Sequence, residues 1–243
     1  MRPFVDMPEA DAARVQLVLA DIDDTLTSEG RLPADAYRAL VDLSNAGFIV
    51  APITGRPAGW CDMIARFWPV AGVVGENGAL YFAYDAASRT MRRTFAASDT
   101  ERSANRVRLE AIKARVLAEV PGAAVSADQA YREADLAIDF CEDVAPLGTE
   151  AVERIKTIFE EAGAITKISS IHVNGWFGQY DKLSMTRRFA WDVAGLNLTG
   201  TMIRSSSWAT APTTRQCSAS SATPAASLAC VISSGGWRRS LPM

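Results

Sequence analysis

The stretch Val15–Leu26, VQLVLADIDDTL, decides how this chain is organised. An apolar run ends there in three carboxylates, Asp21, Asp23 and Asp24, which are followed by a threonine. The run Val15–Ala20 is continuous, contains branched residues and is short, a pattern that predicts a strand buried on both faces. The three carboxylates therefore lie where that strand ends.

The segments that follow alternate between helical and strand patterns. Helices are expected at 33–45 and 57–67, and strands at 48–53 and 72–74, with a proline in the first turn of each helix. This alternation predicts an α/β fold with a Rossmann-like, doubly wound parallel sheet. In such sheets ligands bind beyond the carboxyl ends of the strands, where Asp21 and Thr54 both lie.

From about Tyr84 the pattern changes to an α+β module inserted into the first one. Its expected elements are strands at 79–83, 90–95, 135–140 and 165–173, and helices at 100–120 and 149–162. An amphipathic helix at 181–193 then returns to the first module. We predict a core in two parts (1–83 and 181–199), an inserted α+β domain (84–180) and an aberrant tail rich in Ser, Ala and Thr (200–243).

Composition excludes several function classes. The 243 residues carry a net charge of -3, so nothing suggests a nucleic acid or an anionic membrane as partner. No apolar run is long enough to span a bilayer, and the acidic N-terminus has no signal-peptide pattern. Four scattered cysteines fit a reducing cytoplasm, and a single histidine, His172, argues against Ser-His-Asp and Cys-His enzymes. The oligomeric state stays open.

The carboxylates after the first strand have a spacing suited to phosphoryl chemistry. Side chains at i and i+2 leave a strand on the same side, ~6.5 Å apart, so Asp21 and Asp23 can reach one site. Mg²⁺ suits such a pair, and an aspartate can attack phosphorus while a second carboxyl transfers protons. A calcium loop starting at Asp21 is excluded, because Leu26 and Leu32 stand where it needs Gly and Glu. A turn-forming Asp cluster is the remaining alternative.

Four segments together resemble the motifs of the haloacid dehalogenase superfamily of phosphotransferases. DIDDTL resembles the first motif, DxDxT, and APITGRP (51–57) resembles the second. GENGALYF (75–82) resembles the ENGA segment of the subgroup with a large α/β cap, type IIB, and DKLSMTRRF (181–189) resembles the third motif. The resemblance covers about residues 15–198, and the likeness within the subgroup is to mannosyl-3-phosphoglycerate and sucrose-phosphate phosphatases.

The resemblance implies a Mg²⁺-dependent phosphatase that acts on a small phosphorylated metabolite through an aspartyl-phosphate. It makes Asp21 the nucleophile and a metal ligand, and Asp23 the general acid/base that binds metal through its backbone carbonyl. Thr54 and Lys182 would hold and neutralise the phosphoryl group. Further substrate-binding candidates beneath the cap are Gly55, Arg56 and Asn77.

One histidine and three aromatic residues near the end of the inserted module are expected to have structural roles. Two functions other than a phosphatase also remain open. We expect His172 to be a structural strand residue and Trp176, Phe177 and Tyr180 to pack between cap and core. A phosphomutase would share the aspartyl-phosphate but return the phosphoryl group to another hydroxyl. A non-catalytic product, such as a broken copy or a pseudoenzyme, is the rival from a different class.

The C-terminal region lacks the fourth motif that the resemblance requires, an apolar strand followed by Gly-Asp and a second Asp. No acid follows Asp192. From Met202, a shifted reading frame with TCN serine codons forces Asp, four apolar residues and Gly, and permits Asp and Asn-Asp after them. We therefore predict a frameshift between about Leu198 and Met202, although a disordered extension is the plainer alternative. The first strand would then lack one neighbour, leaving the chain poorly stable and weakly active.

Overall fold

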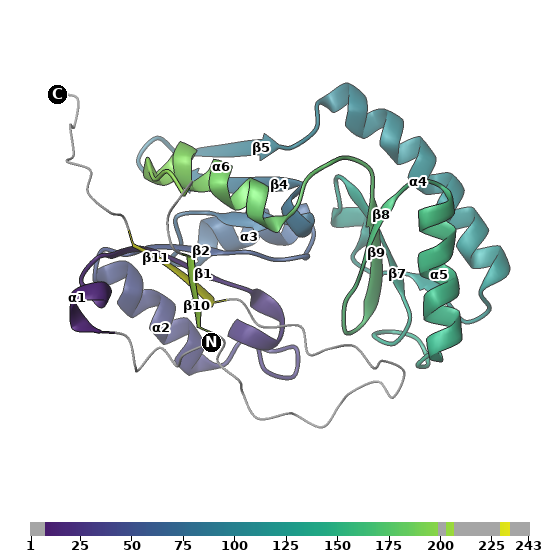
Figure 1. Ribbon diagram of the computed structural model, residues 1–243, viewed down its shortest axis with the longest axis horizontal. Helices are drawn as coiled ribbons and strands as arrows, with labels where there is room; N and C mark the ends of the chain where they lie inside the picture. The colour runs from purple at the N-terminus through teal and green to yellow at the C-terminus, as the bar shows by residue number, and fades with distance from the viewer. Residues whose placement is uncertain (1–7, 199–202, 207–228, 234–243) are drawn as a thin grey trace.

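The computed structural model describes residues 8–198, 203–206 and 229–233 (Figure 1). Strand β1 (Val15–Ala20) forms where the apolar run predicted it and pairs in parallel with β2 (Ile49–Pro52). A bridge between Ile53 and Val74 continues the parallel order to β3 (Val73–Gly75). The expected α/β fold is therefore confirmed, and the segments following β1, β2 and β3 meet at one edge of the sheet.

The far side of this sheet is antiparallel. Strand β4 (Leu80–Asp85) pairs with β3, and β5 (Thr90–Phe95) pairs with β4. The predicted domain boundary at residue 84 falls inside β4, a strand that belongs to the core sheet. The division into core and inserted domain otherwise stays a prediction.

Helices cover the core sheet on both faces. Helix α2 (Ala34–Asn45) begins after Pro33 and α3 (Ala58–Phe67) begins after Pro57, as the sequence predicted. Helix α6 (Lys182–Ala194) lies within one residue of the predicted range 181–193 and ends at the left-handed Gly195. Two apolar clusters hold the layers together. One joins the sheet to α6 through Leu17, Leu19, Ala51, Ile53, Val74, Tyr81, Met185, Phe189, Ala190 and Leu198. The other joins it to α3 through Ile22, Ala58, Cys61, Ile64, Ala65, Val73, Leu80 and Phe82.

A second sheet has the strand order β6-β7-β9-β8 and is antiparallel throughout. Its strands are β6 (Ala124–Val125), β7 (Asp135–Asp139), β8 (Ile165–Ile168) and β9 (His172–Trp176). Helices α4 (Asp99–Glu119) and α5 (Thr149–Glu161) pack on its outer side, away from the core sheet (Figure 1). We call this sheet and its two helices the cap unit.

One expected strand of the cap unit is two strands. The sequence predicted a single strand over 165–173, but β8 and β9 are separated by a tight turn at Ser169–Ile171. In this turn the Ser169 amide donates to the His172 carbonyl at 2.8 Å, and the His172 amide donates to the Ser169 hydroxyl at 2.9 Å. The two serines at 169 and 170 supply the turn chemistry that the apolar pattern concealed.

Short elements complete the described chain. They are α1 (Glu9–Ala12), the turn η2 (Ile22–Leu26), and the 3₁₀ turns η3 (Glu76–Gly78) and η4 (Gln129–Tyr131). Turns η2 and η3 follow β1 and β3 directly, so both lie at the edge of the sheet where the parallel strands end.

The expectation that β1 would lack a neighbour on one side is wrong. Strand β11 (Ala229–Ser233) pairs with β1 antiparallel, and β10 (Ile203–Ser206) pairs with β11. The tail was predicted to have no strand pattern, yet ACVIS contains Val231 and Ile232, which favour strands, and β1 offers unpaired backbone groups to any such segment. The rest of the predicted fourth-motif window, and the proposed frameshift point, lie outside the described residues.

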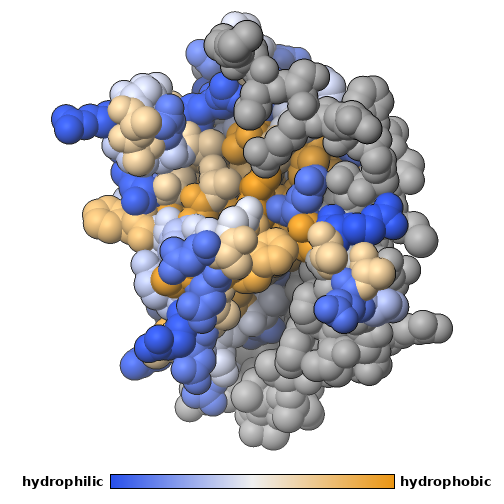
Figure 2. All heavy atoms as spheres, turned by 90° about the vertical axis from the view of Figure 1, so that its left-hand side faces the viewer, coloured by the Kyte–Doolittle hydropathy of each residue, from blue (hydrophilic) through white to orange (hydrophobic). Residues whose placement is uncertain are grey.

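None of the described helices combines the length and the apolar character needed to cross a membrane. Figure 2 shows the face at the left of Figure 1, where hydrophobic side chains gather near the centre beside the atoms drawn in grey. Hydrophilic residues lie on either side of this hydrophobic centre.

Candidate active site

The turn η2 places the aspartates at the end of β1. The Asp21 carboxylate accepts a hydrogen bond from the Ile22 amide at 2.8 Å, which orients it at the start of the turn. Asp24 adopts a left-handed backbone (φ 56°), so the chain reverses there. Burial and the neighbouring Asp23 and Asp21 carboxylates raise the pKa of Asp24. Three carboxylates are thus crowded into one turn, and their mutual repulsion favours a cation close by.

Lys182 reaches Asp21 from the other side of the sheet edge. Its ammonium lies 2.6 Å from Asp21 Oδ2 and 3.4 Å from the Ile53 carbonyl oxygen. Lys182 is the first residue of α6, whose N-terminus is capped by Asp181 and Ser184. The helix N-terminus adds its partial positive charge to the lysine, an arrangement that favours a phosphate next to Asp21.

A close backbone approach fixes this helix start. Gly78, at the end of η3, has φ 102°, and a Cβ there would stand 2.1 Å from the Asp181 carbonyl oxygen. No other residue leaves room for the first turn of α6. The glycine of GENGA therefore positions Lys182, although the two residues are far apart in sequence.

The loop after β2 carries Thr54, Gly55 and Arg56. Thr54 is fully buried, and its hydroxyl oxygen accepts a hydrogen bond from the Arg56 amide at 2.9 Å. The backbone N–H of Asn77 donates to the Thr54 carbonyl at 3.2 Å. The Asn77 side chain covers Gly55 so closely that a Cβ at residue 55 would lie 3.1 Å from its Oδ1. The second-motif loop and the ENGA turn are therefore packed as one unit.

Arg56 lies between the core and the cap unit. It binds Asp23 through Nη2 at 2.8 Å and Nε at 3.0 Å, and stacks over Trp60 at 4.7 Å. Its Nη1 lies 4.0 Å from Asp128 and 3.8 Å from Glu142, both in the cap unit. The predicted substrate-binding residue is thus surrounded by carboxylates, and one of them is the candidate acid/base.

Sequence reasoning missed a buried carboxylate at the junction of core and cap unit. Glu76 is fully buried and accepts four backbone N–H donors: Ala58 at 2.9 Å, Glu133 at 2.8 Å, Ala134 at 2.7 Å and Asp135 at 3.3 Å. Burial, followed by the Asp135 carboxylate, raises the pKa of Glu76 to about 7. Its place inside GENGALYF was visible in the sequence, but nothing there indicated which donors it meets.

Arg132 is the buried cation of the same junction. It binds Asp135 through Nη1 at 3.0 Å and Asp128 through Nε at 3.0 Å, and it donates to the Gly55 carbonyl at 3.2 Å. The Asn174 amide adds a bond to Asp135 at 3.2 Å. This polar network joins the cap sheet to the second-motif loop, so it sets where the cap unit stands over the candidate site.

The aromatic residues expected at this junction divide between two places. Trp176 stacks on Tyr180 with ring centroids 6.0 Å apart, and burial, with Asp135 and Glu76 nearby, raises the pKa of Tyr180. Phe177 instead joins the apolar core of the cap unit, where Arg108 lies over its ring. His172 begins β9 with its Nε2 2.9 Å from Glu142, consistent with the strand position expected for it.

The oxygen donors at the end of β1 fit Mg²⁺. Within the described ranges no group of three or more His, Cys, Asp or Glu is arranged to hold a metal. Mg²⁺ needs only one or two protein carboxylates, because waters and substrate phosphate oxygens complete its shell. Asp21 and Asp23 both remain partly accessible, with 28% and 39% of their side chains exposed.

No family model and no curated protein matches this sequence. Solved structures do match. The Thermoplasma acidophilum protein 0175 is 16% identical over 75% of this chain and 73% of its own, with a TM-score of 0.58. The C-terminal domain of Candida albicans trehalose-6-phosphate phosphatase is 16% identical over 78% of this chain and 66% of its own, also at 0.58.

A third match is a subclass IIB sugar phosphatase of the haloacid dehalogenase superfamily, 14% identical over 76% of this chain and 78% of its own, with a TM-score of 0.51. Matches at such identities establish the fold. This chain has the fold of haloacid dehalogenase superfamily phosphatases, as the four segments that resemble the superfamily's sequence patterns predicted.

Proposed function

We propose that this protein is a phosphoric monoester hydrolase that uses Asp21 as nucleophile and passes through an aspartyl-phosphate. The observation that carries the proposal is the contact of the Lys182 ammonium with Asp21 Oδ2 at 2.6 Å, at the carboxyl end of a parallel strand. This is where α/β sheets bind ligands, and the lysine supplies the positive charge that a phosphoryl group requires.

In the first step a carboxylate oxygen of Asp21 attacks phosphorus, and the bond from phosphorus to the ester oxygen breaks. The leaving alkoxide takes a proton from a carboxyl group, a role that we assign to Asp23. Lys182, Thr54 and the N-terminus of α6 hold the phosphoryl oxygens and balance the charge that develops on them.

Mg²⁺ fits the donor set, with the Asp21 carboxylate and the backbone carbonyl of Asp23 as its protein ligands. When bound, it neutralises phosphoryl and carboxylate charge and orients the two groups toward each other. The residues of the chain perform the remaining work of binding and proton transfer.

In the second step water attacks the phosphorus of the aspartyl-phosphate, and Asp23 accepts the proton that the water loses. The bond from phosphorus to the Asp21 oxygen breaks, which releases inorganic phosphate and restores the Asp21 carboxylate. Asp23 is held by Arg56 through two hydrogen-bonding nitrogens, so proton transfer requires this pair to loosen. Because Arg56 also faces Asp128 and Glu142, movement of the cap unit is a natural way to change its hold on Asp23.

The substrate class we propose is a small phosphorylated metabolite in the cytosol, either a sugar phosphate or a compound like mannosyl-3-phosphoglycerate. Two observations support it: the subclass IIB motifs of the sequence, and the fold shared with a trehalose-6-phosphate phosphatase domain. The substrate-binding candidates of the core are Gly55, Arg56 and Asn77, which lie in the loops beneath the cap unit.

A phosphatase assay on an aryl phosphate, with and without Mg²⁺, tests the proposal. We expect Mg²⁺-dependent turnover that Asp21→Asn abolishes. The chain as given should be weakly active, and a chain with its reading frame restored near Met202 should be much more active. Equal activity of the two chains would refute the expected weak activity of the present chain, and turnover that survives Asp21→Asn would refute the mechanism.

The specific observation favouring a non-catalytic product is that no acid follows Asp192 in the sequence. Such a product would bind phosphate esters but turn over none of them, even with Mg²⁺. The phosphomutase alternative would return labelled phosphate to an isomerised sugar instead of releasing it.

A further inference from the structure

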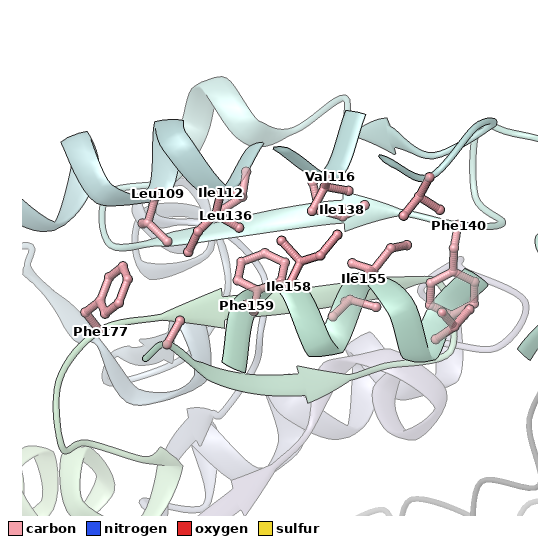
Figure 3. Close-up of a cluster of buried hydrophobic side chains, with 14 residues drawn as sticks. Leu109, Ile112, Val116, Leu136, Ile138, Phe140, Ile155, Ile158, Phe159 and Phe177 are labelled. Atoms are coloured by element: carbon pink, nitrogen blue, oxygen red, sulfur yellow. The ribbon is translucent and has the colours of Figure 1, made fainter. Parts of the chain in front are cut away.

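The cap sheet has two different faces. Leu136, Ile138 and Val173 point outward and pack with α4 and α5 in the apolar core of the cap unit, where Leu136 and Ile138 are labelled in Figure 3. Side chains alternate along a strand, so the neighbours of these residues point the other way. Among these neighbours are Asp135 on β7 and Asn174 on β9.

This second face is turned toward the core. Asn174 bonds Asp135, Asp135 binds Arg132, and Arg132 donates to the carbonyl of Gly55 in the loop after β2. The backbone amide of Asp135 also donates to Glu76 of the core. The polar face of the cap sheet therefore stands over the loops that carry the candidate active site.

Lys167 lies on this face, in the edge strand β8. It is paired with Asn174 in the strand register, while the preceding Thr166 bonds Glu160 of α5 on the opposite face. Its side chain is accessible to solvent. Even so, desolvation by the surrounding protein and the nearby Lys182 ammonium lower its pKa, and Asp21 opposes them. Lys182 and Asp21 of the candidate active site are therefore near Lys167.

The acids on the same side are already matched. Asp135 has Arg132 and Asn174, and Asp139 accepts three backbone amides at 2.7–2.9 Å. Lys167, by contrast, forms no ion pair (4.0 Å or less) with a carboxylate among the residues that the structure describes. The cap unit therefore presents one accessible cation toward Asp21 with no acid engaged to it.

We propose that Lys167 binds a second anionic group on the leaving-group side of the substrate, so that the site favours phosphate esters whose alcohol also carries a carboxylate or phosphate. The proposal rests on the proposed function, since it places the transferring phosphoryl group between Asp21 and Lys182. The leaving group of an in-line displacement departs on the side opposite Asp21, which is the side covered by the cap sheet. An ammonium there meets the alcohol portion rather than the transferring phosphoryl group.

The test compares 3-phosphoglycerate with sn-glycerol 3-phosphate, two esters that differ by a carboxylate in place of a hydroxymethyl group. Dissociation constants are measured by calorimetry in the full chain carrying Asp21→Asn, so that neither ester is hydrolysed. We expect 3-phosphoglycerate to bind about tenfold more tightly, the range of a hydrogen bond between charged groups. Lys167→Gln should remove this preference, and Lys167→Arg should retain most of it.

Lys156→Gln, on the exposed side of α5, is the matched control and should leave both affinities unchanged. Circular dichroism checks that each variant is folded. Equal binding of the two esters by the parent chain, an equal loss for both esters in Lys167→Gln, or binding of neither ester would overturn the proposal. Asp21-dependent hydrolysis in the assay above, observed together with equal binding, would leave the proposed function intact while rejecting the role of Lys167.

Discussion

The candidate active site and the junction between core and cap unit both contain ion pairs, but these pairs differ in their exposure to solvent. At the active site Asp21 and Lys182 keep 28% and 25% of their side chains exposed. At the junction Arg132 and Asp135 keep 1% and 0%. An accessible pair can exchange its partner for a substrate at small cost, whereas breaking a buried pair leaves a charge without solvation. The difference separates the charges to which we assign chemistry from the charges that fix geometry.

The largest expected effect that sharpens this comparison is on rate. Asp21→Asn removes the nucleophile and should lower kcat by at least about a thousandfold, while the free energy of unfolding changes by about 1 kcal/mol or less. Turnover of an aryl phosphate and urea denaturation measure the two quantities, in the chain with the restored reading frame where the signal is largest. Loss of folding together with activity would break the comparison, because the pair would then be structural.

The junction should show the reverse. Glu76→Ala leaves four backbone N–H donors without their acceptor in a buried site, and should lower the free energy of unfolding by about 3 kcal/mol. Glu76→Gln keeps one acceptor oxygen and should lose less. Urea denaturation monitored by circular dichroism gives the values, and a loss below about 1 kcal/mol for the alanine variant would contradict the assigned role.

The contribution of Glu76 to the free energy of unfolding should decrease as the pH rises. The folded protein holds the Glu76 proton up to a pKa of about 7, and the unfolded chain loses it near 4.5. The contribution of Glu76 to stability is therefore full below pH 4.5 and falls as the pH rises toward 7. We expect the difference in unfolding free energy between wild type and Glu76→Ala to be larger at pH 5 than at pH 8. A difference that grows with pH would show that the hydrogen bonds keep Glu76 ionised.

Arg56 belongs partly to both regions and should have an intermediate effect. Arg56→Ala frees Asp23 and removes the contacts to Asp128 and Glu142, so we expect about a tenfold loss in kcat/KM and little loss of stability. The matched control is Arg66→Ala, because Arg66 pairs with Asp62 on the exposed side of α3. An equal effect of the two substitutions on kcat/KM would remove Arg56 from the site.

The smallest effect on turnover is expected for a substitution at Asp24, the neighbour of Asp23, to which no role is assigned. Asp24→Asn keeps a residue type that tolerates the left-handed backbone at this position, so turnover should stay within about twofold of wild type. It is the charge-matched control for Asp21→Asn in the same assay. A large loss of rate here would mean that the carboxylates of the turn act together instead of singly.

Much of the fold was predictable because its signals are local. The apolar run before Asp21 predicted β1, prolines marked the starts of α2 and α3, and an amphipathic pattern predicted α6. The resemblance gave Lys182 and Asp21 roles at one phosphoryl group, and in the structure the Lys182 ammonium lies 2.6 Å from Asp21 Oδ2. Each of these predictions depended on a few consecutive residues or on the order of segments.

The missed features depend on contacts between distant residues. Nothing near Glu76 indicates that its acceptors would meet the backbone of 133–135, and the pairing of β11 with β1 joins segments over two hundred residues apart. The turn between β8 and β9 was missed for another reason. Apolar residues lie on both sides of its two serines, so the whole segment resembles one strand. Lys167 carried no sequence signal, because its place on the face of the cap sheet turned toward the core follows from strand register.

The close approach at Gly78 has a consequence for how the chain is assembled. The chain leaves the core near Ala96, whose amide bonds the carbonyl of Ala79, and it re-enters at Asp181, against Gly78. Both crossings thus meet the core at adjacent residues of one turn. A segment whose two ends lie side by side can be removed or exchanged with a short linker, and the host fold keeps its own connections. The two chain connections of the cap unit therefore reach the core at one place, next to the buried contacts of Glu76 and Arg132 that also join the two parts.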